Sequence, residues 1–187
     1  EKNSGVAGRV ANILKHVYGF GEQQFAAIYE ASRIGLEKFG DRMNMMMLKE
    51  ELEKSPNKTA KTVLSKMAPF FHDVEFTNEE FDWKDVLYPE NGKVTIFQLT
   101  SFVREIQVVI TEFMLWDIWY YTSKYGSKEK PFIVVLDEAQ NLSHTLDSPS
   151  GKILTEGRKF GWSAWYATQS LKILSEDEVI RLMQSAF

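Results

Sequence analysis

The sequence contains no cysteine, only three histidines and no excess of positive charge. The absence of cysteine excludes disulfides and thiolate metal sites, and it fits a reducing, cytoplasmic location. The formal net charge of −4 gives no global basic field of the kind that attracts nucleic acid, although a local basic track remains compatible with it. His16, His72 and His144 lie far apart in the sequence, so each is expected in a core or on a surface rather than at a metal.

A long uncharged apolar run is also lacking. The most apolar stretch, residues 102–123, is interrupted by Arg104, Glu105, Glu112 and Asp117. A membrane-spanning helix needs about 20 mostly uncharged residues, so this stretch is expected to be a buried helix and no membrane partner is predicted. The 187 residues, 44% of them hydrophobic and 26% charged, are enough for one sizeable core.

The first 70 residues are predicted to be a helical portion. Apolar residues recur there at helical spacing in four segments, which are residues 4–20, 21–40, 43–54 and 57–71, and the fourth helix is expected to stop near Pro69. The acidic, aromatic and turn-rich stretch 71–92 is expected to be a connecting loop.

From residue 93 onward the pattern changes to an alternation of strands and helices. Strands are predicted at 93–99, 131–137 and 162–170, and helices at 102–122, 150–161 and 175–186. This order predicts an α/β fold with a partial parallel sheet over residues 93–187, covered by helices on both faces. The apolar "FIVVL" at 132–136 is typical of a central strand.

Two adjacent acids, Asp137 and Glu138, follow that central strand. In open α/β sheets, ligands lie beyond the carboxyl ends of the strands. An aspartate there can hold Mg²⁺ beside nucleotide phosphates, and a neighbouring glutamate can orient the water that attacks the γ-phosphate. The pair therefore matches a Walker B pattern with its catalytic glutamate. Acid pairs at strand ends also occur as simple caps and surface charge.

A second polar set follows further along the chain. Arg158 and Lys159 close a predicted helix, and the next strand ends in Thr168 and Gln169. A glutamine at that place can act as a sensor of the γ-phosphate or the attacking water, and an arginine can reach a nucleotide on a neighbouring subunit. The alternative is that the basic residues only complement a helix C-terminus and that Gln169 only satisfies backbone groups.

Together these motifs resemble those of FtsK/HerA-type P-loop ATPases, which include conjugative coupling proteins and type IV secretion ATPases. The resemblance covers about residues 93–170 and rests on "IVVLDEAQN" and "ILTEGRKFGWSAWYATQS". Within that group, "GKVTIFQLTSF" and "TEGRKFGWS" are most similar to the motor component of DNA phosphorothioation-dependent restriction systems.

The resemblance implies a RecA-like core that uses ATP and Mg²⁺. It makes Asp137 the Mg²⁺-associated acid, Glu138 the catalytic base or water-orienting residue, and Gln169 the sensor supported by Thr168. Arg158 becomes the candidate inter-subunit arginine, with Lys159 beside it. The expected partners are double-stranded DNA, further copies of the same chain in a ring, expected to be a hexamer, and other subunits of a defence complex.

The phosphate-binding loop G-x-x-x-x-G-K-[ST] of this family is missing from the sequence. "SGVAGRV" lacks the lysine, and in "SPSGKIL" Ile153 stands where a hydroxyl is required. Either the chain is part of a longer motor whose loop lies upstream, or it is a degenerate relative that hydrolyses nothing. The first is favoured, and these 187 residues alone are expected to be inactive. A non-catalytic scaffold and a secretion ATPase acting on protein remain the alternative functions.

Overall fold

The computed structural model describes residues 2–76, 81–169, 177 and 180. The chain divides into two compact units. Unit 1 comprises residues 1–79 and 100–109, and unit 2 comprises residues 80–99 and 110–187. Helix α7 (Arg104–Tyr125) contributes its first residues to unit 1 and the rest to unit 2. The structure is mixed α/β, with many helices and a small parallel sheet, which is compatible with the predicted class.

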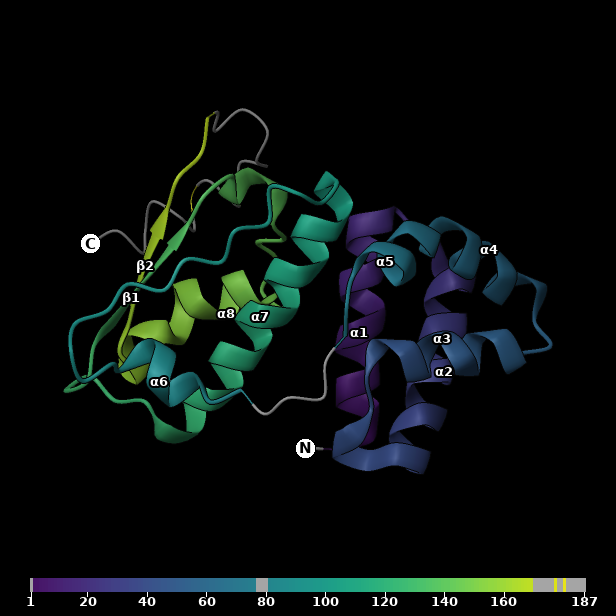
Figure 1. Ribbon diagram of the computed structural model, residues 1–187, viewed down its shortest axis with the longest axis horizontal. Helices are drawn as coiled ribbons and strands as arrows, with labels where there is room; N and C mark the ends of the chain where they lie inside the picture. Colours follow the sequence, from purple (N-terminus) through teal and green to yellow (C-terminus); the bar gives the residue numbers. More distant parts are fainter. Residues whose placement is uncertain (1, 77–80, 170–176, 178–179, 181–187) are drawn as a thin grey trace. The chain divides into compact units, whose positions relative to one another are not determined.

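Unit 1 is built from helices, as Figure 1 shows. They are α1 (Asn3–Tyr18), α2 (Glu22–Phe39), the 3₁₀ turn η1 (Gly40–Arg42), α3 (Met45–Lys54), α4 (Lys58–Lys66) and α5 (Ala68–Asp73). Helix α2 packs against α1, α3 and α4. The fully buried side chains at its centre include Leu14, Ile28, Leu48, Leu52 and Val63. The predicted helical portion is therefore helical as expected.

Local signals set the helix ends in unit 1. Gly19 ends α1 in the left-handed conformation, and Asn44 and Asn57 cap α3 and α4 by accepting backbone N–H bonds. The predicted stop of the fourth helix near Pro69 is confirmed, because α4 ends at Lys66 and the separate short helix α5 begins at Ala68. Pro69 lacks an N–H to continue the α4 ladder, and it lies instead in the first turn of α5, where no such donor is needed.

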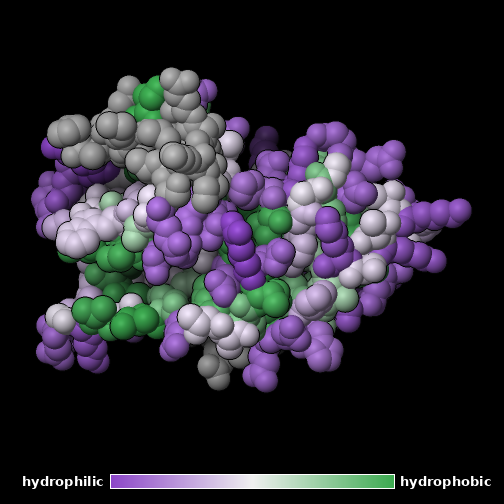
Figure 2. Space-filling view, turned by 90° about the horizontal axis from the view of Figure 1, so that it is seen from above, coloured by the Kyte–Doolittle hydropathy of each residue, from purple (hydrophilic) through white to green (hydrophobic). Residues whose placement is uncertain are grey.

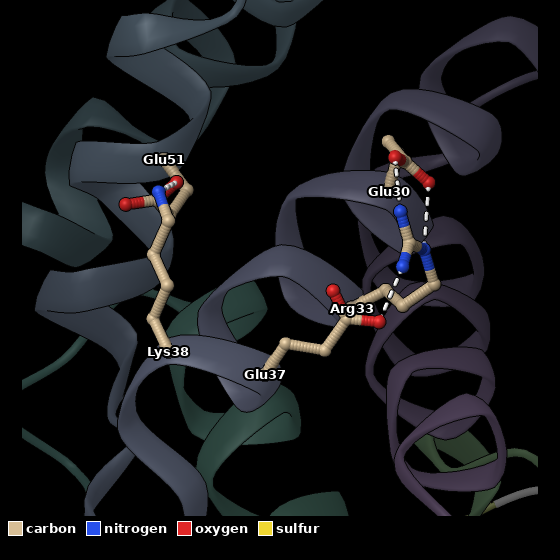
Figure 3. Close-up of polar contacts among 5 residues, drawn as sticks. All are labelled: Glu30, Arg33, Glu37, Lys38 and Glu51. Carbon is tan, nitrogen blue, oxygen red and sulfur yellow. Dashed lines mark hydrogen bonds and ion pairs between the residues drawn. The ribbon is translucent and has the colours of Figure 1, made fainter.

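Unit 1 carries ion pairs between neighbouring side chains (Figure 3). Arg33 lies between Glu30 and Glu37 on α2, with 2.7 Å from its Nη2 to Glu30 Oε1. Lys38 of α2 reaches Glu51 of α3 at 2.6 Å, which joins two helices. Hydrogen bonding from Lys38 holds the pKa of Glu51 below its usual value. These charges are thus matched inside unit 1.

Unit 2 contains a βαβ element. Strands β1 (Phe132–Leu136) and β2 (Trp162–Tyr166) are parallel, with Phe132 opposite Trp162 and Leu136 opposite Tyr166. The chain passes between them through the 3₁₀ turn η2 (Ala139–Asn141), α8 (Pro149–Glu156) and the 3₁₀ turn η3 (Gly157–Phe160). The short helix α6 (Trp83–Leu87) also belongs to this unit and lies within the stretch 71–92 that was expected to be a loop.

One face of this sheet is packed. Phe132 and Trp162 meet edge to face at 4.9 Å between ring centroids, and Trp119 of α7 meets Phe160 at 5.3 Å. The Trp162 indole N–H donates to the Thr122 hydroxyl of α7 over 2.8 Å, in a buried position. α7 thus covers this face of the sheet with apolar side chains and one buried hydrogen bond. The helix predicted at 102–122 is confirmed by α7, Arg104–Tyr125.

The opposite face differs from the prediction. Ile133, Val135 and Trp165 are 61%, 63% and 60% exposed, so the described residues do not cover this face. The strand predicted at 93–99 is also wrong, since that segment joins no ladder and leaves Val94 85% and Ile96 82% exposed. β-propensity only marks residues that suit a pleated surface, and a strand still requires a hydrogen-bonding neighbour. The helix predicted at 175–186 falls almost entirely outside the described residues.

Candidate functional site

The two predicted acids lie on a loop at the carboxyl end of β1. This segment, residues 137–148, is called the acid loop below. Two backbone hydrogen bonds tie its start to β2, from Ala167 N to Leu136 O at 2.8 Å and from Ala139 N to Ala167 O at 2.9 Å. Since β1 and β2 are parallel, the ends of both strands meet at one edge of the sheet. The sequence-predicted residues 137, 138, 168 and 169 are therefore brought to the same edge.

Glu138 has an unusual backbone conformation. Its φ of 52° and ψ of 38° place it in the left-handed region, as the one non-glycine residue with positive φ in the described part. Residues other than glycine rarely adopt this region, because their Cβ makes it strained. Backbone strain of this kind clusters at functional sites. The Asp137 carboxylate accepts the Glu138 N–H at 2.9 Å and so supports the turn.

The side chain of Glu138 meets two amides. The Gln169 side-chain amide donates to Oε1 of Glu138, and the Gln140 side-chain amide donates to Oε2. The first contact joins the ends of β1 and β2 and unites two residues to which the sequence assigned catalytic roles. Two amide donors fix the orientation of a carboxylate without removing its charge. The arrangement leaves Glu138 held at the edge of the sheet.

Asp137 is exposed beside Glu138. One of its oxygens accepts the Glu138 N–H, and a carboxylate in an exposed position suits a hard cation such as Mg²⁺. Among the described residues, no three histidine, aspartate or glutamate side chains gather into a metal site. Asp137 fits a site in which water and phosphate oxygens complete the coordination, which is the usual way in which Mg²⁺ is bound.

Arg158 and Lys159 lie at the other end of the sheet. They belong to η3, which precedes β2, and a strand of five residues spans about 15 Å. Lys159 pairs with Glu156, and its Nζ lies 4.9 Å from the centre of the Phe160 ring. Arg158 is exposed and forms no ion pair with any described residue. The structure therefore does not bring these two basic residues to Asp137 and Glu138 within one chain.

A buried acid that the sequence reading passed over lies beneath the acid loop. Glu112 of α7 is 1% exposed, and its Oε1 accepts the Ser143 backbone N–H at 2.7 Å. Burial raises the pKa of Glu112 to about 7, against the opposing effect of the Ser143 hydrogen bond. The signal in the sequence is an acid in the middle of a largely apolar helix.

His144 follows Ser143 and is fully buried, which is one of the two positions expected for it, in a core or on a surface. Its Nε2 lies 2.7 Å from the carbonyl oxygen of Ala139, and its Nδ1 lies 2.6 Å from the Ser150 hydroxyl of α8. The Ser150 oxygen is in turn 3.2 Å from the Tyr166 hydroxyl on β2. Burial raises the pKa of Tyr166 to about 12, so its hydroxyl stays protonated. The acid loop, α8 and β2 thus each contribute one side chain to a single polar cluster.

The start of α8 contains the glycine and lysine of "SPSGKIL". Ser148 caps this helix by accepting the Gly151 N–H at 3.0 Å. A Cβ at Gly151 would lie only 1.9 Å from the carbonyl oxygen of Thr145, so the glycine is required for close packing on the acid loop. This stretch therefore serves packing in the structure, and its geometry is not that of an open phosphate cradle.

A scan against models of protein families finds no match for this chain, and a search of curated proteins finds none either. Within the described part of the chain, no helix combines the length and the apolar character needed to cross a membrane.

Proposed function

We propose that the chain is the Walker B and sensor portion of an ATP-driven motor of the FtsK/HerA type. The observation that carries this proposal is the contact between Glu138 and Gln169 at the carboxyl edge of a parallel βαβ element. The strained backbone of Glu138 supports it, because a cap or a surface charge would not require the left-handed conformation.

The residues of this edge suit phosphoryl transfer from ATP to water. Asp137 would hold Mg²⁺, which neutralises the charge that develops on the phosphates when it is bound. Glu138 would accept a hydrogen bond from the attacking water, while Gln169 and Gln140 keep its carboxylate in place. A phosphate-binding loop is required as well, and we propose that the whole protein supplies it upstream of residue 1.

The proposed partners follow from the resemblance and from the position of Arg158. An exposed arginine at the far edge of the sheet suits an inter-subunit role better than a role in its own site. A ring of identical subunits would use this residue, with Lys159 beside it, on the nucleotide of a neighbour. Double-stranded DNA and other subunits of a defence complex complete the proposal.

ATP hydrolysis by the whole protein, measured with and without double-stranded DNA, tests the proposal. We expect DNA-stimulated turnover that falls by about 10²–10⁴ in Glu138→Gln, because the variant keeps the shape of the side chain and loses its basicity. Glu129→Gln, at an exposed acid before β1, is the matched control and should retain turnover. Full activity in Glu138→Gln would contradict the role of this residue, and turnover indifferent to DNA would favour a motor that acts on protein.

A non-catalytic interaction module is the second candidate. The exposed face formed by Ile133, Val135 and Trp165 favours it, because an apolar sheet face gains free energy when a partner covers it. No turnover by the whole protein, with or without DNA, would support this function over the first.

A further inference from the structure

Glu112 is an acid kept in a place where an acid is costly. Its side chain is buried in α7, one oxygen accepts the Ser143 N–H, and the other oxygen has no hydrogen-bond partner. A carboxyl group without a full set of partners is expensive to bury, and an apolar residue of similar size would pack there at lower cost. An explanation for Glu112 must therefore come from what its one hydrogen bond holds.

The hydrogen bond of Glu112 leads by a short path to Glu138. Ser143 precedes His144, whose Nε2 donates to the carbonyl oxygen of Ala139 at 2.7 Å, since a carbonyl can only accept. Ala139 follows Glu138 directly, and its own N–H is bonded to Ala167 on the β2 side. The backbone on the C-terminal side of Glu138 is thus held from two directions, by the end of β2 and by the His144 ring.

We propose that Glu112 is a positioning residue for the acid loop. By holding Ser143, it fixes the His144 ring against Ala139, and this contact keeps Glu138 in its left-handed conformation with its carboxylate at Gln169. The inference rests on the proposed function for its consequence in catalysis, whereas the positioning of the loop is a separate claim about the fold. Glu112 touches no substrate on this account, and it acts only through the loop.

Amide hydrogen exchange, followed by NMR in the whole protein, tests the positioning directly. In Glu112→Ala, the Ser143 amide should exchange about 10-fold faster or more, since it loses a hydrogen bond to a buried acid. Glu112→Gln keeps a carbonyl acceptor in the same place and should restore most of the protection. Glu105→Gln, at an exposed acid on the first turn of α7, is the control and should leave exchange unchanged.

A second variant keeps the test decisive if Glu112→Ala fails to fold. His144→Phe retains an aromatic ring and removes the donor to Ala139. It should speed the exchange of the amides at 139–142 while Ser143, still bonded to Glu112, stays protected. If the amides at 139–142 exchange at the wild-type rate in His144→Phe, or in Glu112→Ala when that variant folds, the positioning role would be overturned.

Steady-state kinetics on the same variants separates this inference from the proposed function. Glu112→Ala should lower kcat by about 10-fold and change KM for ATP less than twofold, because a displaced Glu138 affects the reacting water more than nucleotide binding. Rescue of kcat by Glu112→Gln is expected as well. If the wild-type protein hydrolyses no ATP, the proposed function fails and the exchange result still decides the positioning role. If wild type is active and neither exchange nor kcat changes in Glu112→Ala, only the further inference fails.

Discussion

Unit 1 and unit 2 differ in how many large apolar side chains they expose. The ion pairs of unit 1 include Arg33 with Glu30 and Glu37, and its helices turn their apolar side chains inward. In unit 2 one face of the sheet is packed, and several other large apolar side chains are exposed. Among the described residues, every large hydrophobic side chain that is clearly exposed belongs to unit 2, with the exception of Val103. Figure 2 shows mainly hydrophilic side chains on its right and hydrophobic ones gathering on its left.

The difference follows from how helices and strands satisfy their backbones. A helix makes its hydrogen bonds within itself, so a few amphipathic helices can enclose a core without further elements. A parallel strand needs neighbours on both edges and cover on both faces, and a two-stranded sheet alone is marginal. The fold of unit 1 therefore follows from local sequence patterns. Unit 2 depends in addition on further chain or a partner that covers the exposed face and edges of its sheet.

The largest effect is expected from a truncation in the core of unit 1. Ile28→Ala removes a fully buried side chain of α2 and should lower the free energy of unfolding by about 2–5 kcal/mol. All five tryptophans of the sequence lie in unit 2, so their fluorescence reports on unit 2 alone. In urea unfolding followed by far-UV circular dichroism, this variant should lose helix at a lower urea concentration than wild type.

The fluorescence of the same samples serves as the internal control. If unit 1 is specified by itself, the tryptophan transition of Ile28→Ala should stay close to that of wild type. An equal shift of both transitions would show that the units unfold together, and the contrast drawn between them would then not hold for stability.

A smaller, pH-dependent effect is expected at Glu112 in unit 2. Its pKa is raised from 4.5 to about 7 in the folded state, so the folded protein keeps a proton that the unfolded chain releases. The free energy of unfolding should therefore fall between about pH 4.5 and 7, by up to about 3 kcal/mol, and then level off. Glu112→Gln cannot release this proton, so its stability should decline less over the same range.

Tryptophan-detected urea unfolding at pH 5, 6, 7 and 8 measures this difference. Parallel pH curves for wild type and Glu112→Gln would contradict the raised pKa.

The smallest effect on stability is expected on the exposed face of the sheet. Val135→Thr keeps the branched shape and the strand propensity, and the side chain is largely exposed, so the free energy of unfolding should change by less than about 0.5 kcal/mol. Light scattering at increasing protein concentration should show weaker self-association than wild type. A large loss of stability would mean that this face is covered within the chain.

The residues that sequence reasoning placed well are those with local signals. The apolar run before Asp137 and the strand before Thr168 were enough to predict two parallel strand ends at one edge, because alternating elements force that topology. The contact between Glu138 and Gln169 follows from this topology. The hydrogen bond from Gln140 to Glu138 does not follow from it. The division of the sequence into helical and α/β portions rests on the same periodicity.

The errors have physical causes that lie outside local pattern. Residues 93–99 have the composition of a strand, yet no ladder partner accepts them among the described residues, and composition carries no information about a partner. Glu112 was missed because its importance depends on Ser143, which lies 31 residues away in sequence. A lone acid in an apolar helix does not indicate which backbone group it will hold.

The left-handed backbone of Glu138 sets stability and chemistry against each other at one residue. Glycine adopts this conformation without the steric cost that a side chain brings, so Glu138→Gly would relieve roughly 1 kcal/mol of strain while it deletes the carboxylate. Laboratory evolution for thermal tolerance alone would thus tend to select glycine at position 138 and erase the site. A stabilised variant of this protein should be screened for its chemistry before it replaces the original.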